Sequence, residues 1–155
     1  MRFVQAILIL ALPLAPADVS AQTADSSAAR AFFARYVALG EAYDDKVARL
    51  YSDRAVIRSY RRYPHGLERA IELSGSQWKR LLMKVMPLAK AQADRSTFSN
   101  IEVSTTGGRT KIEADRYSVR KCYTDTGYYM LIERQPDGGY LIVEEYSETQ
   151  PQSNC

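Results

Sequence analysis

The sequence predicts an α+β domain in which a curved antiparallel sheet wraps around helices from the N-terminal half of the chain. In that half, apolar residues follow a helical spacing. The stretch from Ser96 to Gln150 instead has the β-branched and aromatic residues of four consecutive strands, separated by turn signals. A sheet with helices on its concave side is an economical packing for this order of elements. The 155 residues fit one domain.

The first 21 residues have the pattern of a cleavable secretory signal. Arg2 is a short charged start, Phe3 to Leu14 is apolar, and Val19-Ser20-Ala21 is a small-residue cleavage site, with Ala15-Pro16-Ala17 as a second possible site. We therefore expect a mature single domain over residues 22–155, periplasmic or secreted, with no membrane span after cleavage. Its net charge of +3 is mildly basic.

Two cysteines remain, Cys122 and, at the last position, Cys155. An even number of cysteines in an exported protein is typical of a disulfide. We predict a Cys122–Cys155 bridge that holds the tail after Pro151 against the sheet. Two free thiols are the alternative.

Three helices are predicted before the main sheet. The first runs from Ala28 to Asp44 and is capped by Asp25-Ser26-Ser27. A short helix follows the second cap, Asp44-Asp45. The third begins after Ser74-Gly75-Ser76 and carries Trp78, and Pro87 should stop or kink it.

A lone early strand is predicted from Ala55 to Tyr63. In the main sheet, Ser96 to Thr106 and Arg109 to Tyr123 form two strands around a Gly107-Gly108 turn, with a bulge near the middle of the second strand.

The last hairpin turns at Pro136-Asp137-Gly138. A three-residue loop pairs Ile132 with Ile142 and Leu131 with Val143. A four-residue loop would pair Leu131 with Glu144 and Glu133 with Ile142, so we favour the first register. Its two faces carry Tyr128, Met130, Ile132, Arg134, Tyr140, Ile142, Glu144 and Tyr146 on one side, and Tyr129, Leu131, Glu133, Leu141, Val143 and Glu145 on the other.

Several short motifs carry a resemblance to a known superfamily. Phe32-Phe33-x-x-Tyr36, the run from Val47 through Leu50 to Val56, and a gap before Trp78 resemble the nuclear-transport-factor-2-like superfamily. The resemblance covers the whole mature chain. It implies a cystatin-like cone, a bent sheet around a long helix with a pocket at the open end. It also implies a homodimer that forms through the convex face of the sheet. The second of the two hairpin faces gives a physical reason for this, because it is half apolar and an apolar surface of that extent seldom stays exposed.

The resemblance does not extend to a standard catalytic site. Members similar to ketosteroid isomerase carry an acidic base on the first strand, where this chain has Arg58 and Ser59. We therefore predict an exported non-catalytic binding domain for a small amphipathic ligand or a protein partner. The alternative is a small-molecule lyase, isomerase or hydrolase that uses Glu144 or Asp115 as its base.

The predicted ligand site lies on the hairpin face that carries Glu144. This face is expected to be concave and to form a partly wet pocket. Its predicted ligand-binding residues are Tyr36, Arg58, Tyr128, Met130 and Glu144. The alternative places Glu144 on the convex face and the pocket behind Leu131 and Val143.

Other site chemistry is weakly represented. His65 stands alone in an apparent loop, and no cluster has the spacing of metal ligands. There is no phosphate-binding glycine motif, so we expect no cofactor. The basic stretch from Arg58 to Arg69 reads as a solvated strand edge, not as a nucleic-acid site, although anionic partners such as lipid headgroups or acidic proteins are open to it.

Overall fold

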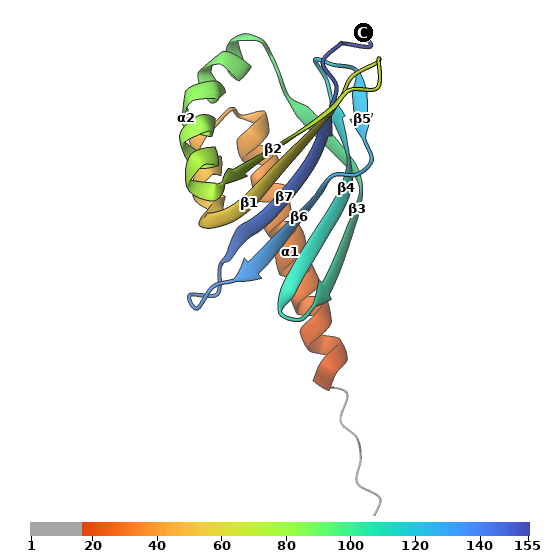
Figure 1. Ribbon diagram of the computed structural model, residues 1–155. Coiled ribbons are helices and arrows are strands. Elements are labelled where there is room, and N and C mark those ends of the chain that lie inside the picture. Colours follow the sequence, from red (N-terminus) through yellow and green to blue (C-terminus); the bar gives the residue numbers. More distant parts are fainter. Residues whose placement is uncertain (1–16) are drawn as a thin grey trace, which may run out of the picture.

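A long helix forms the N-terminal part of the fold. The computed structural model describes the backbone of residues 17–155 and the side chains of residues 23–155. Helix α1 spans Ala17–Glu41 and lies against one face of the sheet, where it contacts β3 and β4 (Figure 1). The predicted cap at residues 25–27 is wrong, because the helix has already begun there. Most of the signal predicted over residues 1–21 lies outside the described residues.

Two further helices follow the predicted order. The short 3-10 helix η1 spans Asp45–Leu50 and is capped by Asp44, whose side chain accepts from the Lys46 N–H at 2.9 Å. Helix α2 spans Gly75–Ala91, and Ser74 and Gln77 cap each other's backbone reciprocally. Pro87 does not stop α2. The N–H that it lacks would bond to the Met83 carbonyl, and Met83 lies on the exposed side of the helix, where water can replace that bond.

The start of α2 sits close to the backbone of the first strand. A Cβ atom at Gly75 would lie 1.8 Å from the Ser52 carbonyl oxygen, so a side chain there does not fit. The Lys79 ammonium pairs with the Asp53 carboxylate at 2.9 Å, and the Ser76 hydroxyl donates to the Asp53 carbonyl. These contacts fix the helix turn that carries Trp78.

The predicted lone strand is half of a hairpin. Strand β1 spans Tyr51–Arg62 and pairs antiparallel with β2, Glu68–Ser74. Strand β2 was not predicted, because nearly all of its side chains are exposed and its apolar face is limited to Ile71 and Leu73.

The remaining strands complete a curved, open, seven-stranded sheet. They are β3 (Ser96–Thr106), β4 (Arg109–Ser118), β5 (Tyr123–Asp125), β6 (Tyr129–Arg134) and β7 (Tyr140–Thr149). The order is β2-β1-β7-β6-β4-β3, with β5 paired to β4. The predicted fold class is confirmed, although the sheet is mixed because β1 and β7 run parallel. The predicted strand from Arg109 to Tyr123 is interrupted after Ser118. The bulge predicted near its middle is wrong, because the additional residue of the β3–β4 pairing lies in β3, between Ser99 and Glu102.

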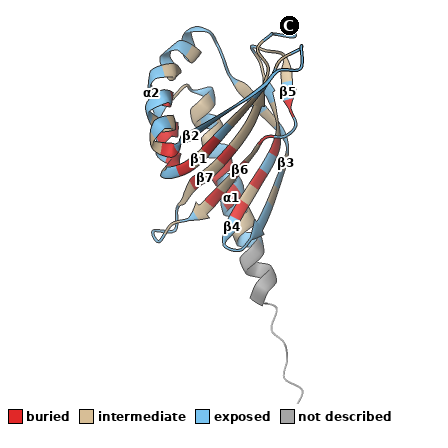
Figure 2. Cartoon of the chain, viewed as in Figure 1, coloured by how far each residue is buried: buried red, intermediate tan, exposed pale blue. Residues whose placement is uncertain are grey.

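The core fills the space between α1, η1 and the middle of the sheet (Figure 2). Phe33 stacks on Tyr36 and meets Phe98 edge-on, while Met130, Ile132 and Ile142 are fully buried beneath them. Buried positions on the central strands therefore mark the face that carries the helices.

A β-bulge interrupts the last hairpin. Ile132 pairs with Ile142, as predicted, but Leu131 pairs with Glu144 and Met130 with Glu145. Val143 is the additional residue. The predicted Leu131–Val143 pair is therefore wrong, and the two alternative registers each hold on one side of the bulge.

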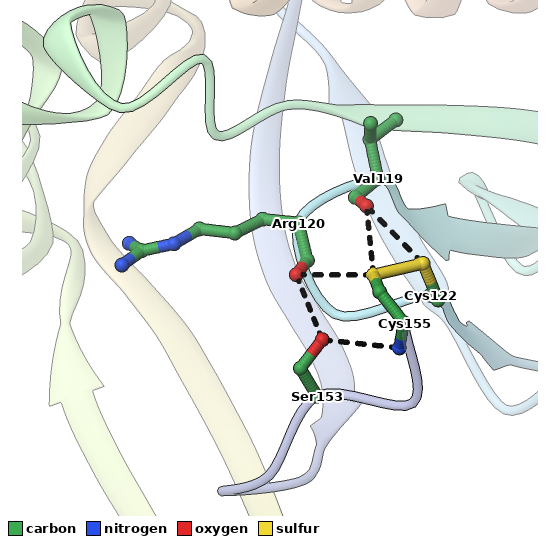
Figure 3. The surroundings of a disulfide bond; sticks show 5 residues. All are labelled: Val119, Arg120, Cys122, Ser153 and Cys155. Carbon is green, nitrogen blue, oxygen red and sulfur yellow. Dashed lines mark hydrogen bonds between the residues drawn. A yellow bond between two sulfur atoms is a disulfide. The ribbon is translucent and has the colours of Figure 1, made fainter.

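The predicted disulfide is present between Cys122 and Cys155. It ties the C-terminal tail to the turn between β4 and β5 (Figure 3). The Asn154 N–H donates to the Lys121 carbonyl at 2.8 Å, and the Ser153 hydroxyl donates to the Arg120 carbonyl at 3.2 Å. The same turn is joined to the connection between α2 and β3 through the Val119 N–H and the Arg95 carbonyl, 3.0 Å apart.

Loss of the disulfide should lower the free energy of unfolding by about 3–4 kcal/mol, because the bond closes a long loop in the unfolded chain. Guanidinium unfolding with and without reductant measures this change. The double variant Cys122→Ser/Cys155→Ser should have the free energy of unfolding of the reduced protein, and reductant should not change it. An unchanged unfolding midpoint in reduced wild-type protein would contradict the prediction.

Candidate functional site

A buried carboxylate lies at the centre of the helix-covered face of the sheet. Glu145, in β7, is 5% exposed. The hydroxyls of Tyr36 and Tyr128 donate to Oε1 at 2.8 Å, and the hydroxyl of Tyr51 donates to Oε2 at 2.5 Å. The three tyrosines come from α1, from the residue before β6 and from the first residue of β1. The network therefore joins both halves of the chain through hydrogen bonds to one charge.

The bulge at Val143 places this carboxylate inside. Side chains alternate between faces, so one additional residue exchanges the faces of everything beyond it. Glu145 consequently shares a face with Met130, its register partner, and occupies the place that was predicted for Glu144.

Glu144 lies on the opposite face, which is a correction to the predicted site. It accepts from the Tyr129 hydroxyl at 2.6 Å and from Arg58 at 2.8 Å, and its side chain is 22% exposed. Arg58 also pairs with Glu72 at 3.1 Å. These two predicted residues are thus separated from the other three by the sheet.

Tyr36, Tyr128 and Met130 do lie together on the helix-covered face. Met130 and Tyr128 are buried in the core, and only Tyr36 of the three also lines a cavity. Glu145, Tyr51 and Arg116 were missed. The adjacent pair Glu144-Glu145 could have indicated two candidate acids, but the choice between them depends on the bulge. Ligand binding by the five predicted residues stays a prediction.

Burial keeps the three tyrosines protonated. Desolvation, followed by the charge of the neighbouring Glu145, raises the pKa of the Tyr36, Tyr51 and Tyr128 hydroxyls well above their ordinary value. Each hydroxyl is consequently a fixed donor. A carboxylate offers about four acceptor positions, so three of those at Glu145 are filled.

A first cavity, of about 180 Å³, opens between the helices and the strands beside α1. We call it the helix-side cavity. Its walls are mostly apolar, and polar groups from β3, β4 and the connection after α2 lie at its margin. Its lining includes Val85, Met86, Ala89, Phe98 and Arg116.

A second cavity, of about 120 Å³, lies between α2 and the sheet. We call it the sheet-side cavity. It shares Tyr36, Trp78 and Arg116 with the first, so these three side chains stand between the two spaces. Ile71 and Leu73 give it apolar walls, and its polar lining is Ser59, Arg116, Glu145 and Ser147.

Arg116 is the cation shared by both cavities. It lies over the ring of Tyr128 at 5.8 Å and donates to the Glu148 carbonyl at 3.3 Å. Asp125 is 3.9 Å away and fully buried, and burial raises the pKa of its carboxyl. The Nε of Arg116 is buried without a hydrogen-bond partner among the described residues. This Nε is the atom that lies 3.9 Å from the Asp125 carboxylate, so it faces the buried acid.

Among the described side chains, those of residues 23–155, no group of three or more His, Cys, Asp or Glu is placed to hold a metal ion. In the same part of the chain, no helix has the length and hydropathy to span a membrane.

The tyrosine network predicts sensitivity to alkali. Unfolded tyrosines lose protons near their ordinary pKa of 10.0, whereas the folded ones keep theirs. Stability should thus be full below pH 10 and be lost as the pH rises above it toward the raised folded values. Urea unfolding between about pH 8 and pH 11 measures this loss. The free energy of unfolding should fall less steeply with pH for Tyr36→Phe than for wild type, since that variant has one fewer titrating group. The exposed control Tyr117→Phe should keep the wild-type slope, and a wild-type slope in Tyr36→Phe would contradict the account.

Comparisons with known proteins bear on the fold. No family model matches the chain, and no curated protein matches it. Solved structures do match. A nuclear-transport-factor-2-like protein with a cystatin-like fold from Novosphingobium aromaticivorans has 13% identity and a TM-score of 0.59 over 85% of this chain and 86% of its own.

Two more solved structures agree with the first. A nuclear-transport-factor-2-like protein of unknown function from Pseudomonas putida has 15% identity and a TM-score of 0.61, over 81% of this chain and 87% of its own. A provisionally named dehydratase of that family from Streptomyces avermitilis has 14% identity and a TM-score of 0.54, over 81% and 96%. The chain therefore has the nuclear-transport-factor-2-like, cystatin-like fold.

Proposed function

We propose that the protein binds a small amphipathic molecule in the helix-side cavity and is not an enzyme. The observation that carries the proposal is the lining of this cavity, which is apolar along α2 and has Arg116 among its polar groups. Ligand sites are typically apolar pockets in which a few convergent polar groups fix the orientation. A space of about 180 Å³ is small for such sites, so it suits a short ligand.

The placement of the acids supports binding over catalysis. A general base must reach a substrate proton, and must have a free lone pair to accept it. Glu144 lies across the sheet from both cavities, and Asp115 is held by the side-chain amide of Asn100 at 2.6 Å. Glu145 borders the sheet-side cavity but already accepts three hydroxyls. A lyase, isomerase or hydrolase function, suggested by the provisional dehydratase name, would need the substrate to reach the one acceptor position of Glu145 that the three tyrosines leave.

The disulfide supports the proposed compartment. Disulfides persist in oxidising surroundings and are rare in the cytosol. We therefore keep the secretory signal over residues 1–21 and a periplasmic or secreted location as part of the proposal. The homodimer also stays a prediction. Its proposed face carries Tyr129, Leu131, Leu141 and Val143, all of which are half-buried in the single chain.

A neutral fluorophore tests the cavity. N-phenyl-1-naphthylamine emits strongly in apolar surroundings, so its fluorescence should rise with mature protein. Ala89→Trp places a large ring in the helix-side cavity and should weaken binding at least about tenfold, because it fills the space.

Leu88→Trp is the matched control, since Leu88 is exposed on the same turn of α2 and does not line the cavity. It should bind the fluorophore as the wild type does. Absence of binding, or equal binding by both variants, would contradict a ligand site in this cavity.

A further inference from the structure

Two arginines on the β1–β2 hairpin have no carboxylate partner in the described chain. Arg61 and Arg69 are directly opposite each other in the β1–β2 register, and both are exposed. Their neighbours on the other face differ. Arg58 pairs with Glu72 and Glu144, and Arg62 pairs with Glu148. Arg61 and Arg69 thus form an unpaired couple of like charges on one face of the hairpin.

That face is the one that lines the sheet-side cavity. Ser59 and Ile71 line the cavity and are paired across the hairpin. Because side chains alternate, Arg61 and Arg69 lie on the same face, one step nearer the hairpin turn. Two residues along a strand span about 7 Å, so the arginine pair stands just beyond the end of the cavity.

Like charges directly opposite each other on a sheet repel and destabilise the pairing. Nothing else on this face of the hairpin offsets the repulsion within the described residues, since no acid lies within ion-pairing distance of either guanidinium. An anion between the two would remove it, and two guanidinium groups can each bind a carboxylate, sulfate or phosphate through paired N–H donors.

The lining between the arginines and the cavity is apolar. Ile71 is 55% exposed on this face, and Leu73 and Trp78 lie deeper. A ligand that covers Ile71 with hydrocarbon would place its charged group outward, next to Arg61 and Arg69. It would also keep that charge away from Glu145 at the inner end.

We infer that the ligand is an amphipathic anion, whose charged group binds between Arg61 and Arg69 while its apolar part runs through the sheet-side cavity and past Trp78, which lines both cavities, into the helix-side cavity. The inference rests on the proposed function and adds the chemical class of the ligand. The hydroxyls of Ser59 and Ser147, which line the sheet-side cavity, then meet any polar atom along the ligand.

A pair of displacers of equal chain length tests the charge. Decanoate and decanol are titrated, below the concentrations at which they aggregate, against protein loaded with N-phenyl-1-naphthylamine. In Arg61→Gln/Arg69→Gln the apparent Kd of decanoate should rise about tenfold, and that of decanol should change less than about twofold. Added salt should weaken the binding of decanoate to wild-type protein and should have little effect on its binding to the variant.

A control variant separates location from net charge. Arg35→Gln/Arg80→Gln removes two exposed helix charges that lie outside the cavity linings, and should leave both displacers unchanged. Equal decanoate affinity in wild type and Arg61→Gln/Arg69→Gln, with both displacers still active, would overturn the anion site and leave the cavity site standing. Failure of the fluorophore to bind wild-type protein would overturn both.

Vesicles distinguish a free amphiphile from a lipid surface. Wild-type protein and the Arg61→Gln/Arg69→Gln variant are sedimented with phosphatidylcholine vesicles that contain phosphatidylglycerol. If wild type and variant sediment with the vesicles weakly and to the same extent, the result agrees with a free ligand. Loss of sedimentation in the variant, with decanoate displacement unchanged, would assign the arginines to a membrane surface and overturn the inference.

Discussion

One buried charge organises the concave side of this protein. Glu145 gathers hydroxyls from α1, from the start of β1 and from the entry to β6, which are far apart in sequence. A buried carboxylate without such donors would be strongly unfavourable, so the three tyrosines and the acid stabilise one another. The single additional residue at Val143 makes this arrangement possible, since it turns Glu145 inward and Glu144 outward.

The same network shapes the candidate site. Tyr36 belongs both to the network and to the two cavities, and Arg116 lies over the ring of Tyr128. The acid therefore acts chiefly by holding the cavity walls in place. This role of the acid agrees with the proposed recognition of a ligand by Arg116 inside and by Arg61 and Arg69 at the hairpin.

Much of the fold follows from local sequence patterns. The helical spacing around Phe33 and Tyr36, the Ser74 cap and the turn at residues 136–138 each act over a few residues, and the structure has all of them. The Cys122–Cys155 pair could be predicted because only two cysteines are present.

What the sequence did not predict depends on contacts across the fold. β2 is an exposed edge strand, so the alternation of Ile71 and Leu73 is too short to mark it. The bulge has no local signal either, because Val143 suits a regular strand as well as a bulged one. An error of one residue there exchanges Glu144 with Glu145, and with them the whole predicted pocket face. Arg116 was missed because its role depends on strands that the chain reaches only later.

The assignment of the two glutamates is tested most directly by comparing Glu145→Leu with Glu144→Leu in urea unfolding at neutral pH. Glu145→Leu leaves three buried tyrosine hydroxyls without an acceptor, so it should lower the free energy of unfolding by about 3 kcal/mol or more. Glu144→Leu removes a partly exposed ion pair and should change it by less than about 1 kcal/mol. A larger loss for Glu144→Leu than for Glu145→Leu, or equal losses, would contradict the buried network.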